Sequence, residues 1–271
     1  QVDVFTDTPL KGNPLAVVMD GSGLDAAAMQ RFTNWTNLSE ATFLLPPTHA
    51  DADYAVRIFC PGRELPFAGH PTLGSCHAWL QAGGQPKGEL IVQECGVGLV
   101  RIRQDGERLA FAAPSRIKSG PLDEADVQRI ARGLGIARAD IVAHAWCHNG
   151  PPWRSVMLRS AAQVLALKAD SAVLSGWEVG VVAPQAAGHD AQFEVRAFFT
   201  GNNGIAEDPV TGSLNAALAQ WLIGDGLAPP DYVAAQGTAM GRDGRVFVQQ
   251  DGLDIWIGGH SVTVIEGSVL L

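Results

Sequence analysis

Val56-Arg57-Ile58-Phe59 recurs 139 residues later as Val195-Arg196-Ala197-Phe198, and this repeat decides how the chain of 271 residues is organised. Fifteen positions beyond each arginine stands a threonine, Thr72 in the first half and Thr211 in the second. Each threonine is followed by small residues and an apolar run with helical spacing. Self-similarity at a fixed offset is the mark of a repeated structural unit, so the sequence predicts a duplicated fold.

Apolar periodicity predicts similar elements in both halves. In the first half we expect strands at 2–5, 15–19, 41–45, 54–59, 90–93, 98–103 and 109–112, with helices at 25–36 and 71–82. In the second half we expect helices at 123–134, 161–167 and 211–223, with strands at 141–147, 153–158, 179–183, 193–199, 245–250, 255–257 and 262–269. Strands and helices do not alternate regularly, so the pattern favours an α+β fold with much antiparallel sheet over a doubly wound one.

The length also favours two lobes, because single hydrophobic cores stop growing near roughly 250–300 residues. We place the N-terminal lobe at 1–115 and the C-terminal lobe at 116–271. The last strand, at about 260–271, is expected to return to the first lobe.

Composition excludes several classes of protein. Nineteen Lys and Arg stand against 28 Asp and Glu, for a net charge of −9, and 46% of the residues are hydrophobic. Such a chain folds, and its charge disfavours nucleic acid as a partner. No apolar stretch approaches the roughly 18–20 residues of a membrane helix. The four cysteines are too scattered for a disulfide framework, which fits a cytoplasmic protein.

Two prolines mark the expected starts of the central helices. Pro71 and Pro209 suit the first helical position, which predicts His70 and Asp208 as N-caps. If the two helix starts converge on a cleft between the lobes, their free N–H groups would hold the carboxylate of an acidic small molecule. Simple N-capping is the alternative for Asp208. A histidine is not a favoured cap, so for His70 a partner in a site is the stronger interpretation.

Glu40 and Ser213 are further candidates for chemistry. Glu40 stands directly before an apolar strand, where an exposed edge charge is the ordinary interpretation and an inward-facing proton-transfer group is the functional one. Ser213 is either a plain first-turn helix serine or part of such a site.

Other chemistries lack their sequence signals. The surroundings of Ser213 lack the Gly-x-Ser-x-Gly elbow of a hydrolase. Cys60, His70, Cys76 and His77 do not have the spacing of a compact zinc site. A dinucleotide glycine fingerprint and a phosphate loop are missing as well, so we expect no metal and no nucleotide cofactor.

Several ordered motifs along the chain carry a resemblance to a known family. They are Val2-Asp3-Val4-Phe5-Thr6, Gly12-Asn13-Pro14-Leu15-Ala16-Val17-Val18, Asn37-Leu38-Ser39-Glu40-Ala41-Thr42-Phe43, Glu64 to Gly74 with Gly69-His70-Pro71-Thr72, and Glu207-Asp208-Pro209-Val210-Thr211-Gly212-Ser213. With these motifs the chain resembles the phenazine-biosynthesis PhzF-like family. The resemblance implies the diaminopimelate epimerase-like fold, in which two pseudo-symmetric lobes each wrap a strongly curved, mostly antiparallel sheet around a central helix.

The resemblance also implies a site and a reaction. Glu40 corresponds to the family's proton-shuttling glutamate in a cofactor-free isomerisation, and His70, Asp208 and Ser213 line the same cleft. The residues around the two helix starts are then expected to bind substrate: Gly69, Pro71, Thr72, Thr211 and Gly212. The family substrate type is trans-2,3-dihydro-3-hydroxyanthranilate, a small carboxylic acid, and the family suggests a homodimer.

Two alternatives stay open beside the isomerase. One is a binding member of the fold without efficient catalysis, and the other is an amino-acid epimerase. Related epimerases use two cysteines at the helix starts, but the matching positions here look like Ala68 and Asp208, which argues against two-thiol chemistry. Cys60 replaces a threonine common in the family and is expected either as a buried strand-end residue or as a residue that shapes the substrate pocket.

Overall fold

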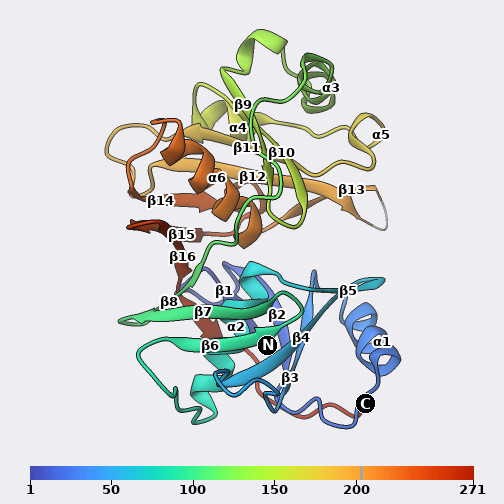
Figure 1. The fold of residues 1–271 in the computed structure, drawn as a ribbon. Helices are drawn as coiled ribbons and strands as arrows, with labels where there is room; N and C mark the ends of the chain where they lie inside the picture. Colours follow the sequence, from blue (N-terminus) through green and yellow to red (C-terminus); the bar gives the residue numbers. More distant parts are fainter. Residues whose placement is uncertain (202–203) are drawn as a thin grey trace. The chain divides into compact units, whose positions relative to one another are not determined.

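The computed structural model describes residues 1–201 and 204–271, and the chain divides into two compact units (Figure 1). Unit 1 comprises Gln1–Ala112 and Gly258–Leu271, and unit 2 comprises Ala113–Ile257. The C-terminal segment belongs to unit 1 because β17 (Ser261–Thr263) pairs antiparallel with β1 (Val2–Val4).

Unit 1 is a mixed, mainly antiparallel sheet with two helices. Its other strands are β2 (Asn13–Val18), β3 (Ala41–Leu45), β4 (Tyr54–Cys60), β5 (Arg63–Leu65), β6 (Ile91–Cys95), β7 (Gly98–Asp105) and β8 (Arg108–Ala112). Its helices are α1 (Ala26–Thr36) and α2 (Gly69–Gln81). Strands β2 and β3 are parallel, as are β4 and β6, and the remaining neighbours are antiparallel.

Helix α2 is the centre of unit 1, and the strands surround it (Figure 1). Every residue from Gly69 to Cys76 is buried. The helix lies close to β1 and β2 because Gly74 has no side chain: a Cβ there would stand 2.6 Å from Leu15 and 2.9 Å from Val4. The start of α2 is therefore held firmly in the core of the unit.

Unit 2 has the same kind of construction. Its strands are β9 (Ala143–His148), β10 (Pro152–Met157), β11 (Val179–Pro184), β12 (Phe193–Gly201), β13 (Gly204–Asp208), β14 (Asp231–Gln236), β15 (Gly244–Asp251) and the greater part of β16 (Asp254–Gly259). Its helices are α3 (Glu124–Leu134), α4 (Ala161–Ala166), α5 (Ser171–Leu174) and α6 (Gly212–Gly224), with short 3-10 turns at Arg138–Asp140 and Thr238–Met240. Helix α6 is almost completely buried and packs on β9 and β15.

The two units repeat one topology, which confirms the predicted duplication. The pairings of β1, β2, β3, β4 and β6 recur in β9, β10, β11, β12 and β14, including parallel contacts at β2–β3 and β10–β11 and at β4–β6 and β12–β14. A bidentate ion pair also recurs. The guanidinium of Arg57 donates to both carboxylate oxygens of Glu64 at 2.7 Å, and that of Arg196 donates to both carboxylate oxygens of Glu207 at 2.8 and 2.7 Å.

Some expected elements differ from the structure. Strands β5, β13 and β14 and helix α5 were not expected, because they are short and lack a long apolar pattern. The strand expected at 262–269 is only Ser261–Thr263, and the residues beyond it are exposed for the most part. The α+β class and the one central helix per half are correct.

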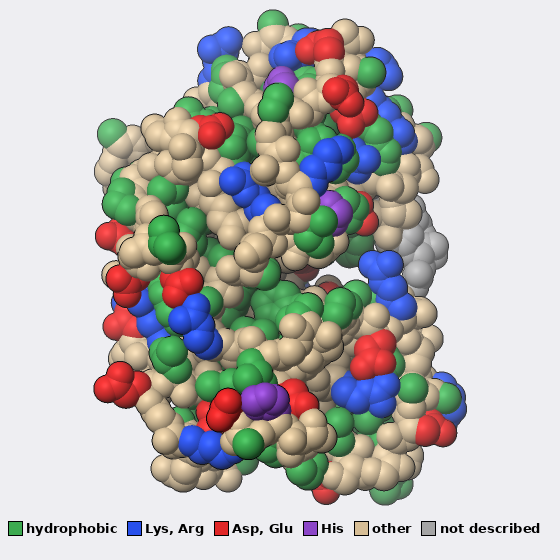
Figure 2. All heavy atoms as spheres, viewed as in Figure 1, with side chains coloured by type: hydrophobic (Ala, Val, Ile, Leu, Met, Phe, Trp, Pro, Cys, Tyr) green, Lys and Arg blue, Asp and Glu red, His purple; other side chains and the backbone are tan. Residues whose placement is uncertain are grey.

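Charged side chains of both signs lie on the surface. On the face shown in Figure 2, Lys and Arg side chains are interspersed with Asp and Glu. Within residues 1–201 and 204–271, no helix is long and apolar enough to cross a membrane.

Candidate active-site residues

The first turn of α2 holds His70. The N-cap is Ala68, in extended conformation, so His70 is the second helical residue and not the cap expected from the sequence. Pro71 is the third helical residue. A proline is tolerated there because the first four N–H groups of a helix have no partner within it. The proline preference for the first helical position therefore misplaced the helix start by two residues.

His70 is buried in a defined protonation state. The side chain is 4% exposed, and burial lowers its pKa to about 3, so the imidazole is neutral. Its Nδ1 lies 3.2 Å from the amide Nδ2 of Asn13. Because an amide N–H can only donate, Nδ1 is the acceptor and Nε2 carries the proton. This Nε2 lies 3.4 Å from a carboxylate oxygen of Glu40.

Glu40 is not an exposed charge at the edge of a strand, which was one of the two interpretations of the sequence. Its side chain is 17% exposed and its carboxylate lies beside His70. The placement follows from β3, since Ala41 pairs with Phe59 and Thr42 accepts a 2.8 Å hydrogen bond from Ser75 of α2. The strand that follows Glu40 is thus fixed both to β4 and to the central helix.

Cys60 ends β4, directly beyond the Phe59–Ala41 pair, and is half-buried rather than buried. Burial raises the pKa of its thiol, and the nearby negative charge of Glu40 raises it further. Cys60 is therefore a neutral thiol within electrostatic range of Glu40.

In unit 2, Asp208 and Thr211 are in direct contact. Asp208 is the last residue of β13 and pairs with Ala197, so it is not the helix cap that its proline predicted. The N-cap of α6 is Thr211, whose hydroxyl donates to Oδ2 of Asp208 at 2.6 Å. A distance this short is typical of a hydrogen bond to an ionised acceptor.

The structure corrects how the two halves correspond at the helices. The pairs Phe59–Glu64 and Phe198–Glu207 stand at the same place in their hairpins, which makes the β12–β13 hairpin four residues longer than β4–β5. Each central helix then starts at a glycine, Gly69 and Gly212, so that His70 corresponds to Ser213 and Ala68 to Thr211. Thr72 therefore corresponds to Asn215 and not to Thr211, the partner that the repeat spacing predicts.

Ser213 is held by two residues that the sequence did not single out. Trp153 donates its indole N–H to Ser213 Oγ at 3.2 Å, and Asn149 donates to the Ser213 backbone oxygen at 2.8 Å. Since Oγ accepts from the indole, its own proton is directed elsewhere. Trp153 and Asn149 stand 60 and 64 positions before Ser213 in the chain, so no local sequence motif predicts these contacts.

The expected site residues thus form one group in each unit. In unit 1, Glu40 and His70 are in contact, with Gly69, Pro71 and Thr72 in the first turn of α2. The Thr72 hydroxyl is engaged inside the unit, donating to Ala68 and accepting from Gln93. In unit 2, Asp208 and Thr211 are in contact, with Gly212 and Ser213 opening α6. Among the side chains that the structure describes, no group of three or more His, Cys, Asp or Glu is arranged to hold a metal ion.

Comparison with known proteins gives consistent relatives. Residues 2–267 match the family model described as phenazine biosynthesis-like protein (PhzC-PhzF). Antisense-enhancing sequence 1 of Schizosaccharomyces pombe is 34% identical, covering 98% of this chain and 96% of the relative. The trans-2,3-dihydro-3-hydroxyanthranilate isomerase of Pseudomonas chlororaphis is 32% identical, covering 100% and 98%.

A solved structure shares the fold. The PhzF-family phenazine biosynthesis protein of Bacillus anthracis superposes with a TM-score of 0.84 at 23% identity, covering 100% of this chain and 97% of that one. The motifs, the duplicated fold and the whole-length matches agree, so this chain belongs to the phenazine biosynthesis-like PhzC-PhzF family and is an isomerase of the PhzF type.

Proposed function

We propose that this isomerase moves a proton within a small unsaturated or cyclic carboxylic acid, with Glu40 as the general acid and base and with no cofactor. The observation that supports this most is the 3.4 Å contact between Glu40 and the neutral Nε2–H of His70. A carboxylate with a positioned hydrogen-bond donor beside it can take a proton and return it.

In the proposed reaction, Glu40 removes a proton from a carbon next to the unsaturated system. The electron pair of that C–H bond moves into the conjugated system, and Glu40 then delivers the proton to a different carbon of the same substrate. His70 holds its Nε2–H 3.4 Å from the Glu40 carboxylate, and Asn13 on Nδ1 keeps it in that tautomer. One acid–base group on one face is enough for such a shift, whereas stereoinversion needs a group on each face.

The helix starts supply the proposed substrate contacts. Helices α2 and α6 each have 13 residues, and the first N–H groups of a helix have no intrahelical partner. We assign the backbone N–H groups at the two helix starts, Gly69 in α2 and Gly212 in α6, to substrate binding. Ser213 contributes its hydroxyl proton as a donor, since Trp153 already donates to its oxygen.

Two-thiol racemisation gains no support from the corrected correspondence of the halves. The residues that precede the helices are Ala68 and Thr211, and neither has a thiol. The substrate we propose to test first is trans-2,3-dihydro-3-hydroxyanthranilate, on which the Pseudomonas chlororaphis relative acts by its name.

The test is proton NMR of the purified protein with this compound in deuterated buffer. Wild type should convert it with uptake of solvent deuterium at carbon, and Glu40→Gln should lower turnover by roughly 100-fold or more. Glu94→Gln is the matched control, since Glu94 is a carboxylate of unit 1 held by Thr48 and His49. Turnover retained in Glu40→Gln would remove the assigned base. A folded wild type that neither converts the compound nor exchanges deuterium into it would exclude this compound as the substrate.

The proposal includes a homodimer. Sedimentation should then give about twice the chain mass of 28.6 kDa, and a monomer at all concentrations would contradict it.

A further inference from the structure

Gln236, the last residue of β14, is fully buried and uses its whole side-chain amide in hydrogen bonds. Its Oε1 accepts from the backbone N–H of Thr211 at 3.0 Å and from the amide of Asn215 at 2.8 Å. Its Nε2 donates to the backbone oxygen of Asp208 at 3.1 Å and to the hydroxyl of Thr211 at 2.8 Å. The two backbone partners fix which end is oxygen, because a flipped amide would set donor against donor and acceptor against acceptor.

This fixed amide sets the direction of a second hydrogen bond. Thr211 Oγ1 receives the N–H of Gln236, so the hydroxyl proton can go only to an acceptor. That acceptor is Oδ2 of Asp208, at 2.6 Å. The direction runs from Gln236 through Thr211 to the Asp208 carboxylate, and it is imposed by the amide N–H, which cannot accept.

The backbone around Gln236 is built for this close approach. Gly237 has a φ of +89°, and a Cβ there would lie 2.6 Å from the backbone oxygen of Pro209. A residue with a side chain would push the end of β14 away from the segment that carries Asp208 and Thr211. With glycine at position 237, the side chain of Gln236 comes within hydrogen-bond distance of both Asp208 and Thr211.

Unit 1 contains a related glutamine–threonine hydrogen bond, but there the threonine donates to a backbone oxygen and not to a carboxylate. Gln93 of β6 donates to Thr72 at 3.1 Å, and Thr72 is the fourth residue of α2 as Asn215 is of α6. Thr72 donates its own proton to the backbone oxygen of Ala68 at 2.9 Å. In unit 1 the glutamine therefore joins the Tyr54 hydroxyl to the helix start, whereas in unit 2 the hydrogen bonds extend to a carboxylate.

We propose that Gln236 is a positioning residue of the isomerase: through the Thr211 hydroxyl and the Asp208 backbone it holds the Asp208 carboxylate in its working orientation. The inference rests on the proposed function for the role of Asp208 in turnover. The arrangement of the three residues does not depend on that role.

Gln236→Glu tests the direction of the hydrogen bonds. The introduced carboxylate has no N–H, so the Thr211 hydroxyl turns toward it and no longer donates to Asp208. Thr211→Val removes the same donor without a new charge, and Thr211→Ser keeps the hydroxyl. We expect kcat on trans-2,3-dihydro-3-hydroxyanthranilate to fall roughly 10- to 100-fold in Gln236→Glu and Thr211→Val, with Thr211→Ser near wild type.

The double variant separates positioning from general damage. If Thr211 acts only by donating to Asp208, Gln236→Glu combined with Thr211→Val is no slower than Gln236→Glu alone. Losses that multiply would overturn the proposal. Gln93→Glu is the matched control for the Asp208 carboxylate, because it places a carboxylate on a buried glutamine whose hydrogen bonds reach Tyr54, Thr72 and, through Thr72, the backbone oxygen of Ala68.

A measurement that does not depend on turnover distinguishes the positioning role of Gln236 from the proposed isomerase function. The side-chain carboxyl carbon of Asp208, observed by carbon-13 NMR and assigned with Asp208→Asn, should shift in Thr211→Val and Gln236→Glu and stay in place in Gln93→Glu. An unmoved Asp208 signal in folded Thr211→Val would refute the positioning role. If wild type does not convert the compound, the proposed function fails while this measurement still decides about Gln236.

Discussion

Asn13 donates its side-chain amide to Nδ1 of His70 across 3.2 Å, and this contact decides which nitrogen of the imidazole carries the proton. Asn13 is the first residue of β2 and is fully buried, so the donor is held by the sheet. The Nε2–H of His70 that faces Glu40 therefore depends on a residue 57 positions away in the chain.

Asn13→Asp should change the tautomer of His70. A carboxylate at this position accepts a hydrogen bond from a protonated Nδ1, so the imidazole either carries its proton on Nδ1 instead of Nε2 or becomes a cation. Nitrogen-15 NMR of the His70 ring should show protonated Nε2 in wild type and protonated Nδ1 in the variant. Turnover should fall with it, whereas Asn34→Asp on the exposed side of α1 should leave the His70 signals unchanged. The same ring spectrum in Asn13→Asp and wild type would contradict the assignment.

The neutral state of His70 predicts a loss of stability in acid. The pKa is about 3 in the folded protein, against 6.5 for an unperturbed histidine, so below pH 6.5 the unfolded chain binds a proton that the folded chain does not. Stability attributable to His70 is therefore complete above pH 6.5 and decreases as the pH falls toward 3. By linkage the decrease from pH 7.5 to pH 5 is about 2 kcal/mol.

Urea unfolding at the two pH values measures this effect. His70→Gln should show a decrease between pH 7.5 and pH 5 that is smaller by that amount, whatever its absolute stability. His148, exposed on its ring edge and bonded to the Gly150 oxygen, provides the control variant His148→Gln. An unchanged pH dependence in His70→Gln would mean that another group causes the acid sensitivity.

Local sequence patterns were sufficient for most elements and for the residue types of the site. Apolar periodicity located both central helices, and the motifs singled out Glu40, His70, Asp208 and Ser213. They misplaced the caps, because the preference of proline for the first helical position was stronger than the signal of Ala68 or Thr211. Asp208 belongs to β13 because it pairs with Ala197 of β12, and local sequence does not predict this contact.

The residues that orient the site were missed for a common physical reason. Asn13, Trp153, Asn149 and Gln236 act through hydrogen bonds to partners 21 to 64 positions away. Asparagine, glutamine and tryptophan are also common as ordinary core or turn residues, so one sequence contains no signal for such contacts. Even the duplicated topology does not point to Gln236, because the residue of β14 in register with Gln93 of β6 is Ala234.

A stack of cations and indoles in unit 2 should contribute measurably to stability. The guanidinium of Arg154 lies 4.4 Å from the ring of Trp146 and 4.1 Å from the ring of Trp177, and that of Arg129 lies 4.0 Å from the ring of Trp177. Arg154→Met keeps the aliphatic stem and removes the charge. We expect a loss of about 2 kcal/mol in urea unfolding, because the pairs are partly desolvated. Arg108→Met, at an exposed hairpin ion pair with Asp105, should cost less than about 1 kcal/mol.

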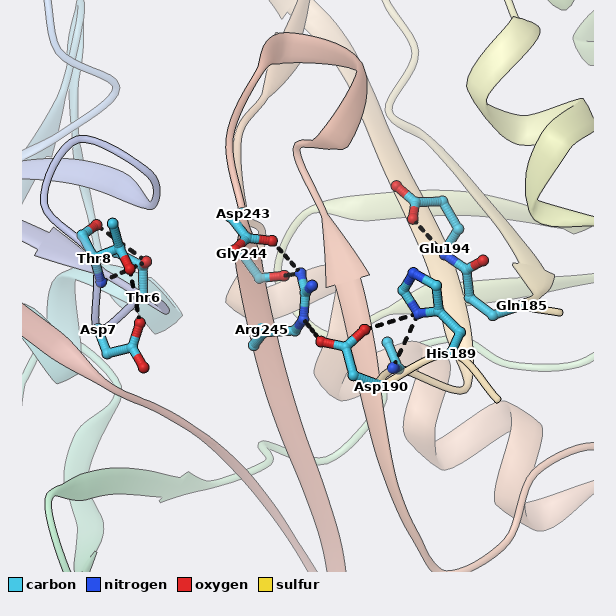
Figure 3. Close-up of polar contacts among 11 residues, drawn as sticks. Thr6, Asp7, Thr8, Gln185, His189, Asp190, Glu194, Asp243, Gly244 and Arg245 are labelled. Carbon is cyan, nitrogen blue, oxygen red and sulfur yellow. Dashed lines mark hydrogen bonds and ion pairs between the residues drawn. The ribbon is translucent and has the colours of Figure 1, made fainter. Parts of the chain in front are cut away.

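Glu194 is a buried carboxyl that should make unit 2 less stable at high pH. It lies on β12 and accepts a 2.8 Å hydrogen bond from Gln185, and Figure 3 shows it near His189 and Arg245. Burial raises its pKa, although a hydrogen bond from Thr238 and the charges of Arg245 and Arg196 act in the opposite direction. The folded protein therefore holds this proton to higher pH than the unfolded chain does, and stability decreases as the pH rises through the folded pKa.

Glu194→Gln removes the ionisation and keeps an oxygen for Gln185. The variant should gain stability relative to wild type at pH 8 and show no such gain at pH 4, where both side chains are neutral. Thermal unfolding of both proteins at the two pH values is sufficient, with Asp243→Asn as the control, because Asp243 is an exposed partner of Arg245 in the same cluster. A variant less stable than wild type at pH 8 would show that the attraction of Arg245 and Arg196 for the carboxylate outweighs the cost of its burial.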